Sequence, residues 1–446
     1  MPTETKKKEP LIHITRRKYV SWKRSWAVRG IAIVLALIVC ALVTTLMTGE
    51  NPIEVFGSII TGAFGTPRKA WIMGQEMAIL LCVSLALAPA FKMKFWNLGG
   101  EGQVLAGGMA AAACMILLGG KVESGAMPEW LLILIMIVCS IAAGALWGFI
   151  PAFFKAKWGT NETLFTLMMN YVATQLVAYF VILWEVPKGA GKIGIINQTS
   201  EAGWLPQIGD FKYLLNILVV LVLTAGMYVY LKYSKQGYEL TVVGESERTA
   251  NYVGINVKKV IIRTMLISGA LCGVAGLLLV GGTDHTITTT ISGGRGFTAV
   301  MVAWLAKFNP LGMIFTTFLL VLLGRGANEI STVFGLNKSF GDILTGIILF
   351  FIIGSEFFIN YEVHFRKSHK NEDAEDVADA ETIKPVEASA GEASPIAGDE
   401  AVSDSGSGAT ASSDPEKQAL ERILRDVETA GKNIDQAYSD GKEELK

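Results

Sequence analysis

The sequence predicts an all-α, polytopic membrane protein with about ten transmembrane helices, some of them broken or half-spanning. Three observations lead to this prediction: the apolar content, the length of the apolar runs, and the uneven distribution of charge. Apolar residues make up 51% of the 446-residue chain and only 18% are charged, whereas about 25% are charged in soluble domains. The mean hydropathy is +0.42. The chain is therefore too apolar for an ordinary soluble enzyme.

Ten apolar runs approach the roughly 20 residues that a helix needs to cross a bilayer. The eighth and ninth are short and meet at Pro310, so we predict a bent or half-spanning element there, because proline interrupts a helix. The first run has a basic flank but is too long for a cleaved signal peptide, so we expect an uncleaved anchor. The runs are Gly30–Thr48, Ile72–Phe91, Gly100–Leu118, Trp130–Phe154, Leu164–Trp184, Tyr213–Tyr230, Val260–Gly281, Phe297–Phe308, Leu311–Gly324 and Ile343–Ile359.

Lysine and arginine are enriched on the cytoplasmic side of membrane proteins. They are frequent in the N-terminal lead and in every second connection, including those that hold Lys92, Lys155 and Lys232–Arg263. Both termini are therefore expected in the cytoplasm, and this orientation requires an even number of spans.

The chain divides into four regions along its length. Residues 1–29 form a basic cytoplasmic lead, residues 30–361 the transmembrane domain, residues 362–413 an acidic linker predicted to be disordered, and residues 414–446 a candidate amphipathic cytoplasmic helix. From Asn371 onward there are 20 Asp and Glu against 7 Lys and Arg, although the whole chain carries a net charge of only −1. The sequence leaves open whether the last helix binds a partner or is a solvated, partly helical tail.

Polar residues at membrane depth are costly and usually face a protein interior or a water-filled path. The first such cluster is Asn97-Leu98-Gly99-Gly100-Glu101-Gly102-Gln103, in which glycines loosen the start of the third apolar run. Interrupted segments are tolerated where they line a cavity. We therefore expect this cluster to line a cavity, with capping of its own helix by Glu101 as the alternative.

A second cluster opens the fifth apolar run. Thr160 or Asn161 is expected to cap that helix, with Glu162 in its first turn. Asn170 lies two turns deeper, where its amide needs an interhelical hydrogen bond. For Asn170 we favour a structural bond over a substrate contact.

A third polar stretch, Gly281–His285 with Ser292–Phe297, separates a full apolar run from the short one that precedes Pro310. This stretch and the Asn97–Gln103 cluster each precede a glycine-rich apolar segment, one in each half of the chain. Such placement indicates two related halves that meet at a translocation path.

Two connections are long enough to contact other proteins. The stretch Gly237–Lys259 mixes charges with a short helix that ends at Gly254, and this helix is either a docking element for a soluble partner or part of an ordinary loop. The connection Trp184–Lys212 is expected outside the cell, as a docking surface or as a simple link.

Motifs for ATP hydrolysis and for metal binding are absent from the sequence. No G-x-x-x-x-G-K-[ST] phosphate loop, H-E-x-x-H pair or nucleophile elbow occurs, and the five cysteines lie in apolar runs without metal-ligand spacing. We therefore expect no catalytic residues, no metal and no cofactor in this chain.

Four motifs, in this order, resemble those of bacterial permeases from the nucleoside and simple-sugar branch of ABC importers, and the similarity runs from about Val28 to Tyr361. The acidic tail after Lys370 departs from that pattern. The motifs are Phe95-Trp96-Asn97-Leu98-Gly99-Gly100-Glu101-Gly102-Gln103, Thr160-Asn161-Glu162 with Met168-Met169-Asn170-Tyr171, Gly237-Tyr238-Glu239-Leu240 with Val243-Gly244-Glu245, and Gly294–Phe297 with Asn309-Pro310.

The resemblance implies a transport subunit of the bacterial inner (plasma) membrane that moves nucleosides or related simple sugars by alternating access. It implies cytoplasmic ABC ATPase subunits that bind the ATP, a second permease (identical or related), an extracellular substrate-binding protein and surrounding membrane lipids, but no nucleic acid. It also implies that Glu245–Gly254 is the coupling element against the ATPase, and the residues assigned to coupling are Gly244, Glu245, Arg248, Ala250 and Gly254. From the polar clusters we assign to the translocation path Asn97, Glu101, Gln103, Asn161, Glu162, Asn170 and Phe297.

Two other functions are compatible with the residues themselves. An ion-coupled secondary transporter acting alone would use Glu101 or Asp284 as a proton or cation carrier. A membrane scaffold or receptor would anchor partners through its tail.

Overall fold

The computed structural model describes residues 12–17, 21–49, 51–209, 211–335 and 338–365, and most of these are helical. The segment 366–446, which holds nearly all of the predicted linker and the predicted terminal helix, lies outside the described residues. The elements are β1 (Ile12–Arg16), α1 (Trp22–Thr48), α2 (Pro52–Phe64), α3 (Pro67–Lys92), α4 (Gly100–Glu123), α5 (Glu129–Trp158), α6 (Glu162–Trp184), α7 (Leu214–Tyr233), α8 (Lys235–Glu245), α9 (Glu247–Tyr252), α10 (Val257–Leu279), the π-helical turn η1 (Val280–Asp284), α11 (Arg295–Leu305), α12 (Pro310–Val333), α13 (Lys338–Asn360) and β2 (Tyr361–Phe365).

Nine of the described helices are long and apolar enough to cross a membrane. They coincide with nine of the ten predicted runs, which confirms the all-α polytopic prediction. The eighth run forms the short helix α11, as predicted. The sequence analysis did not predict α2, a short apolar helix between α1 and α3.

The ninth run was wrongly predicted to be short. It was expected to end near Gly324, but α12 continues to Val333. The apparent break is Arg325, whose Nε and Nη2 donate to the carboxylate of Glu76 on α3 at 2.6 and 2.9 Å. Because the guanidinium is paired in this bidentate way, the helix can carry it at membrane depth.

Several helices begin with the same local signal. Asn51, Thr66 and Asn309 each accept a hydrogen bond from a backbone N–H of the following first turn, and each precedes a proline. Proline suits the first helical position because its missing N–H would have no intrahelical partner there. These caps set where α2, α3 and α12 start.

The turn-rich segment 285–294 and α11 together cross between the two ends of α10. At one end, the carbonyl of His285 accepts a hydrogen bond from the backbone N–H of Ile196, in the connection between α6 and α7 (2.8 Å). At the other end, Trp304 packs on Phe91, one residue before the end of α3 (ring centroids 6.4 Å apart). With the nine long helices this segment makes ten passages, the number that the sequence predicts.

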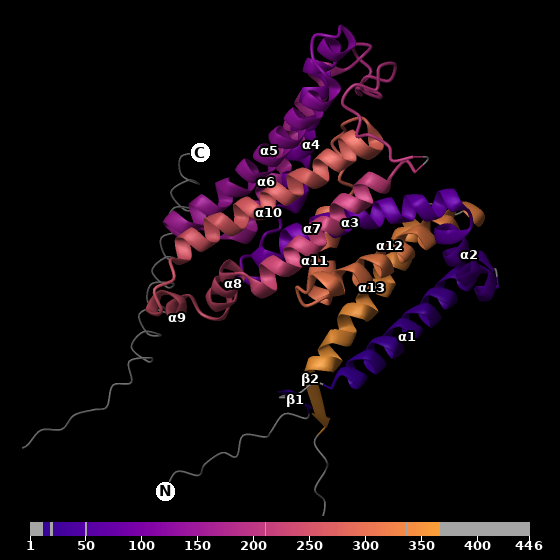
Figure 1. Ribbon diagram of the computed structural model, residues 1–446. Helices are drawn as coiled ribbons and strands as arrows, with labels where there is room; N and C mark the ends of the chain where they lie inside the picture. Colours follow the sequence, from indigo (N-terminus) through magenta and orange to yellow (C-terminus); the bar gives the residue numbers. More distant parts are fainter. Residues whose placement is uncertain (1–11, 18–20, 50, 210, 336–337, 366–446) are drawn as a thin grey trace, which may run out of the picture. The chain divides into compact units, whose positions relative to one another are not determined.

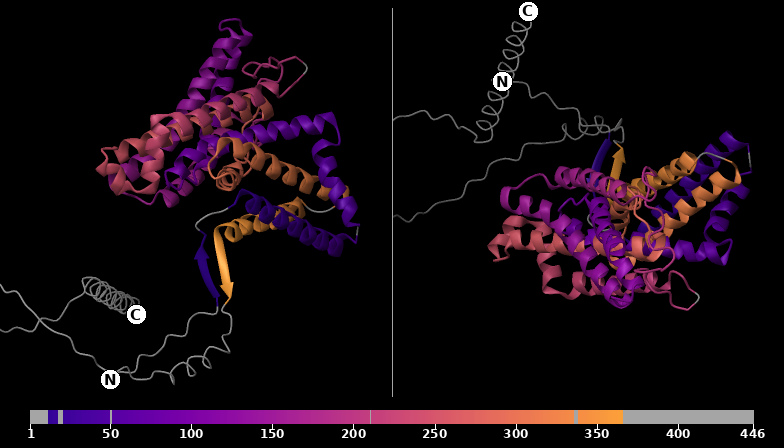
Figure 2. Two further views of the ribbon diagram at one scale, coloured as in Figure 1. Left: turned by 60° about the horizontal axis from the view of Figure 1, so that its bottom comes forward. Right: turned by 90° about the horizontal axis from the view of Figure 1, so that it is seen from above.

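The first and last described segments lie together. Strand β1 pairs antiparallel with β2, so that Ile12 faces Phe365 and Arg16 faces Tyr361. Arg17 adds an ion pair to Glu362 at 3.1 Å. Figure 2 shows the two strands side by side at the ends of α1 and α13. Both ends of the membrane domain are therefore on one side, as an even number of passages requires.

Helices α3, α4 and α10 form the centre of the bundle. In their apolar windows 67–72% of residues are buried, against 28% for α5, α6 and α7. Figure 1 shows α10 running alongside α5, with α1 and α13 adjacent elsewhere. A helix buried on most of its surface needs neighbours that approach closely, and small residues allow this.

Glycines provide the close approach between α5 and α10. A Cβ on Gly269 would fall on the carbonyl oxygen of Gly144, and a Cβ on Gly273 would fall on that of Ser140. The other side of α10 is equally close, because a Cβ on Gly107 of α4 would meet the backbone of Gly273. Gly273 of α10 is thus packed against both α4 and α5.

We expect Gly273→Ala to lower the stability of the bundle by about 1–3 kcal/mol, the usual effect of overpacking a tight interior. The measurement is the midpoint of thermal unfolding of the purified chain in detergent. Gly226→Ala on α7 is the matched control, because a Cβ there meets nothing within 4 Å, and alanine should be neutral or slightly stabilising in the helix. Equal midpoints for the two variants would contradict the packing role of Gly273.

Candidate functional site

The connection between α3 and α4 enters the bundle without helical structure, and Asn97 holds it against α10. The side chain of Asn97 is fully buried. Its Nδ2 donates to Ser268 Oγ at 3.1 Å, and its Oδ1 accepts from the backbone N–H of Gly99 at 3.0 Å and from Gln103 Nε2 at 3.3 Å. Gln103 is 1% exposed. Both amides therefore use their hydrogen-bonding capacity to shape this connection.

Helix α6 holds the same connection from the other side. Asn170 Oδ1 accepts from the backbone N–H of Gly102 (2.8 Å), and its Nδ2 donates to the carbonyl of Leu98 (2.8 Å). Thr166 Oγ1 accepts from the N–H of Leu98 (3.1 Å). Backbone groups that lack helical partners inside a bundle need such substitutes. For Asn170 the structure shows the interhelical structural bond that the sequence analysis favoured.

Glu101 caps the N-terminus of α11, a helix almost 200 residues later in the sequence. Its Oε1 accepts from the backbone N–H of Gly294 at 3.0 Å, and its Oε2 accepts from that of Gly296 at 2.9 Å. A carboxylate is favoured at the positive end of a helix dipole. Gly296 has no Cβ, and a Cβ there would meet the backbone of Glu101. The sequence analysis had considered capping only of Glu101's own helix.

The remaining predicted path residues lie in two places. Phe297 follows Gly296 on α11 and is 45% exposed. Asn161 and Glu162 lie at the N-terminus of α6 instead. Asn161 caps the helix by accepting a hydrogen bond from Leu164 N–H at 3.1 Å, and Glu162 forms an ion pair with Lys155 at 2.7 Å. The structure thus gathers Asn97, Gln103, Asn170 and Glu101 around the start of α4, with Phe297 beside them, and places Asn161 and Glu162 apart.

The segment between η1 and α11 is rich in hydroxyl groups that the sequence analysis did not single out. Within the described residues, the side-chain hydroxyls of Thr286, Thr288, Thr289 and Thr290 have no hydrogen-bond partner. All four are at least partly exposed. They lie on the turn-rich part of the crossing that leads to α11. The run of threonines in the sequence was a signal that could have identified them.

A second buried amide network surrounds η1, at the C-terminal end of α10. Asn216 Nδ2 on α7 donates to Gln75 Oε1 (3.2 Å) and to the carbonyl of Gly282 (3.3 Å), and Gln75 Nε2 donates to Thr283 Oγ1. Both amides are 2% exposed. A π-helical turn often marks a functional position. Sequence reasoning missed both residues, although each is a single amide in an apolar run.

The connection between α6 and α7 packs on that same end of α10. The N–H of Leu205 donates to the carbonyl of Gly281 at 2.8 Å, and Trp204 stacks on His285 with ring centroids 3.8 Å apart. At its start, the N–H groups of Gly189 and Gly191 donate to Glu185 and lower the pKa of that carboxyl. The connection is therefore structured and anchored to η1.

Helix α8 lies against the end of α3, and α9 lies against α8 and α10. A Cβ on Gly244 would meet the carbonyl oxygen of Lys92, and Ala250 is fully buried. Ser246 caps α9 by accepting from Thr249 N–H at 3.2 Å, while Gly254 has a φ of +83° and ends the segment. These contacts fix the segment to the bundle.

The outer face of this segment carries the remaining predicted coupling residues. Glu245 and Arg248 are exposed. Tyr252 is 92% exposed and Val253 58%, and an exposed apolar patch on a polar rim is typical of a protein interface. An open pocket of about 570 Å³, lined by Glu247, Asn251 and neighbouring residues of α5 and α10, adjoins it.

The chain is similar over most of its length to known permeases. A family model described as "Branched-chain amino acid transport system / permease component" matches residues 72–353. The guanosine ABC transporter permease protein NupP of Bacillus subtilis is 31% identical over 329 residues, which cover 73% of this chain and 92% of that protein. No solved structure matches.

Two further relatives carry similar names. The nucleoside ABC transporter permease protein NupB of Lactococcus lactis subsp. cremoris is 27% identical, covering 72% of this chain and 89% of that protein. The glucose ABC transporter permease protein TsgB13 of Haloferax volcanii is 24% identical, covering 78% and 93%. These matches do not favour a secondary transporter that acts alone. The chain belongs to this permease family and is the multi-pass permease component of an ABC importer.

Proposed function

We propose that this permease conducts nucleosides, with its own residues forming one half of the path and separate ATPase subunits supplying the energy. The observation that carries the substrate class is the 31% identity to a guanosine permease over 92% of that protein's length. The relatives named for nucleosides and for glucose share a substrate chemistry, since both kinds of molecule are uncharged and rich in hydroxyl groups.

The proposed path runs along the segment 285–294 and the exposed face of α11. The free hydroxyls of Thr288 and Thr290 can exchange hydrogen bonds with ribose hydroxyls. Phe297 and Met301, 45% and 38% exposed on one face of α11, provide an apolar surface on which a nucleobase can stack. Asn97, Gln103 and Asn170 serve this path by holding the backbone that supports α11, because their side chains are buried.

Coupling to ATP is assigned to the outer face of α8 and α9. In this proposal both termini and this segment lie in the cytoplasm, where the exposed patch around Tyr252 and Val253 contacts an ATPase subunit. Closure of the ATPase pair would push the segment against the end of α3 at Lys92. The next nine residues lead to Glu101, which caps α11. The movement would therefore reach the path through these contacts. An external binding protein would deliver the substrate to the opposite end.

Glu245→Ala combined with Arg248→Ala is expected to weaken ATPase binding and reduce nucleoside uptake at least tenfold with normal expression, because both side chains are exposed on the proposed interface. The measurement is uptake of labelled guanosine by cells, with the amount of P-loop ATPase that copurifies with the chain. The matched control is Glu54→Ala with Arg68→Ala, two exposed residues at the other end of the bundle. It should keep the ATPase at wild-type level. Unchanged ATPase recovery in the first variant would exclude this coupling surface.

Glu101→Ala is expected to reduce uptake about tenfold while the ATPase still copurifies. The substitution removes the acceptor of two backbone N–H groups, and each lost hydrogen bond to a charged group amounts to roughly 1.5–3 kcal/mol. Glu123→Ala, an exposed carboxylate at the other end of α4, is the control and should transport normally. Wild-type uptake by the Glu101 variant would show that the position of α11 does not govern transport.

A further inference from the structure

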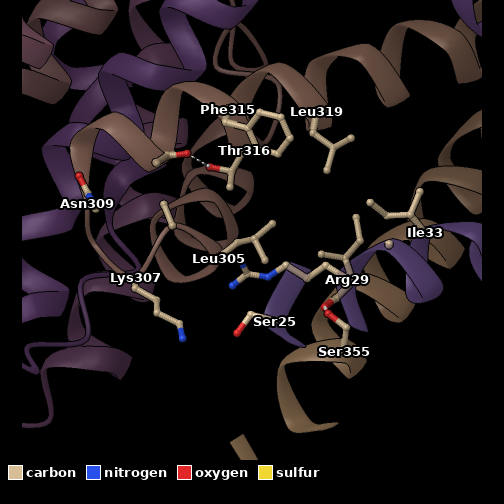
Figure 3. A pocket seen from close by; sticks show the side chains of 14 residues that line it. Ser25, Arg29, Ile33, Leu305, Lys307, Asn309, Phe315, Thr316, Leu319 and Ser355 are labelled. Carbon is tan, nitrogen blue, oxygen red and sulfur yellow. Dashed lines mark hydrogen bonds between the residues drawn. The ribbon is translucent and has the colours of Figure 1, made fainter. Parts of the chain in front are cut away.

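A groove of about 680 Å³ separates the first turns of α1 from α12 and from the loop that precedes α12. Its wall is mostly apolar and includes Ile33, Leu305, Phe315, Leu319 and Ile352. Figure 3 shows Phe315 and Leu319 facing this space from α12 and Ile33 facing it from α1. The lining of the groove does not include the residues of the proposed path.

Two cations lie at one end of the groove and share a single carboxylate. Arg29 Nη2 lies 3.1 Å from Glu356 Oε2, and Lys307 Nζ lies 3.2 Å from Glu356 Oε1. The three charges leave a net charge of +1. The Nε–H of Arg29 has no hydrogen-bond acceptor among the described residues. In Figure 3, Arg29 extends from α1 into the open space, with Lys307 and Ser25 beside it.

The groove also has a defined position along the membrane normal. Ser25 and Arg29 lie in the first two turns of α1, Asn309 caps α12, and Ser355 lies in the last two turns of α13. Three membrane helices thus end at the polar side of the groove, whereas the apolar wall continues toward their middle. The N-terminus of α12 adds its positive dipole end at the polar side. A cationic rim above an apolar groove matches an amphiphile that stands in the bilayer.

We propose that this groove binds an anionic phospholipid of the surrounding membrane. The phosphate would contact Arg29 and Lys307, since a guanidinium binds phosphate through several N–H groups and basic pockets between helices are a recurrent site for anionic headgroups. One acyl chain lies along Ile33, Leu319 and Ile352. A bound lipid of this kind joins α1 to α12, which face each other across the groove.

The chemistry distinguishes this ligand from the two other candidates. A nucleoside is uncharged and would leave the excess positive charge at Arg29 and Lys307 unpaired. A soluble phosphate compound would use the cations but would leave the apolar wall of the groove empty. Only a lipid satisfies both parts of the groove, and Glu356 acts as a weak internal competitor for its phosphate.

The test is native mass spectrometry of the full chain in detergent with added phosphatidylglycerol or phosphatidylcholine of the same acyl composition. Wild-type protein is expected to retain phosphatidylglycerol at least fivefold more than phosphatidylcholine. Arg29→Gln combined with Lys307→Gln should reduce phosphatidylglycerol retention at least fivefold. Glu356→Gln should raise it at least twofold, because it removes the competing carboxylate.

The controls distinguish a specific lipid-binding site from nonspecific electrostatic attraction of anionic lipid to the protein. Arg24→Gln removes the same charge from an exposed position on α1 one turn away and should leave retention unchanged. sn-Glycerol 3-phosphate alone should not displace the lipid. Equal retention of the two lipids, retention by the double glutamine variant, loss of lipid in Glu356→Gln, or displacement by glycerol phosphate would each overturn the proposal. Thermal unfolding of every variant, read without lipid, identifies any that is misfolded.

Discussion

The pairing of backbone groups where helices are interrupted inside the membrane is the constraint on which this structure depends. A broken helix leaves N–H and C=O groups without partners, and lipid offers none. Here two breaks meet: the start of α4 and the start of α11. Asn97 and Asn170 satisfy the first, and Glu101, which belongs to the first, satisfies the second. The cap on the second break is therefore supplied by a residue of the first.

These hydrogen bonds connect the start of α4 with distant parts of the chain. Asn97 binds Ser268 of α10, Leu98 binds Asn170 of α6, and Glu101 binds the start of α11. The same connection begins at Lys92, where Gly244 brings α8 against α3. A displacement of α8 therefore acts on a segment whose buried amide, Asn97, and whose backbone at Leu98 and Gly99 are hydrogen-bonded. Such a segment can move between discrete arrangements but cannot deform continuously without losing hydrogen bonds.

Sequence analysis predicted the elements whose structure depends on neighbouring residues. It failed for elements whose structure depends on contacts between segments far apart in the chain. Apolar runs of sufficient length predicted eight of the nine long helices, and Pro310 with its short neighbour predicted the half-helix α11. The end of α12 was wrong because Arg325 looks like a boundary until its partner Glu76, 249 positions away, is known. The pairing of β1 with β2 involves the two ends of the described chain and has no local signal.

The same distinction applies to the candidate site. Polar residues at membrane depth identified Asn97, Glu101 and Asn170 as exceptional, because their cost is evident from the sequence alone. Their partners were not evident. A carboxylate one turn inside a helix looks like a cap for that helix, and only the tertiary fold shows that Glu101 caps α11 instead. The Gln75 and Asn216 pair was missed because each amide stands alone in its run.

The two amide networks meet α10 at two different levels, one at Ser268 in its middle and one around η1 at its C-terminal end. Between these levels, Gly269 and Gly273 bring α10 so close to α5 that an added Cβ would meet backbone. At both levels a helix is interrupted and side-chain amides bind backbone groups, in the connection before α4 and at the π turn η1. Alternating access requires two states of the bundle that differ in their contacts. These two interruptions are where the backbone is held by side chains in place of regular helical hydrogen bonds.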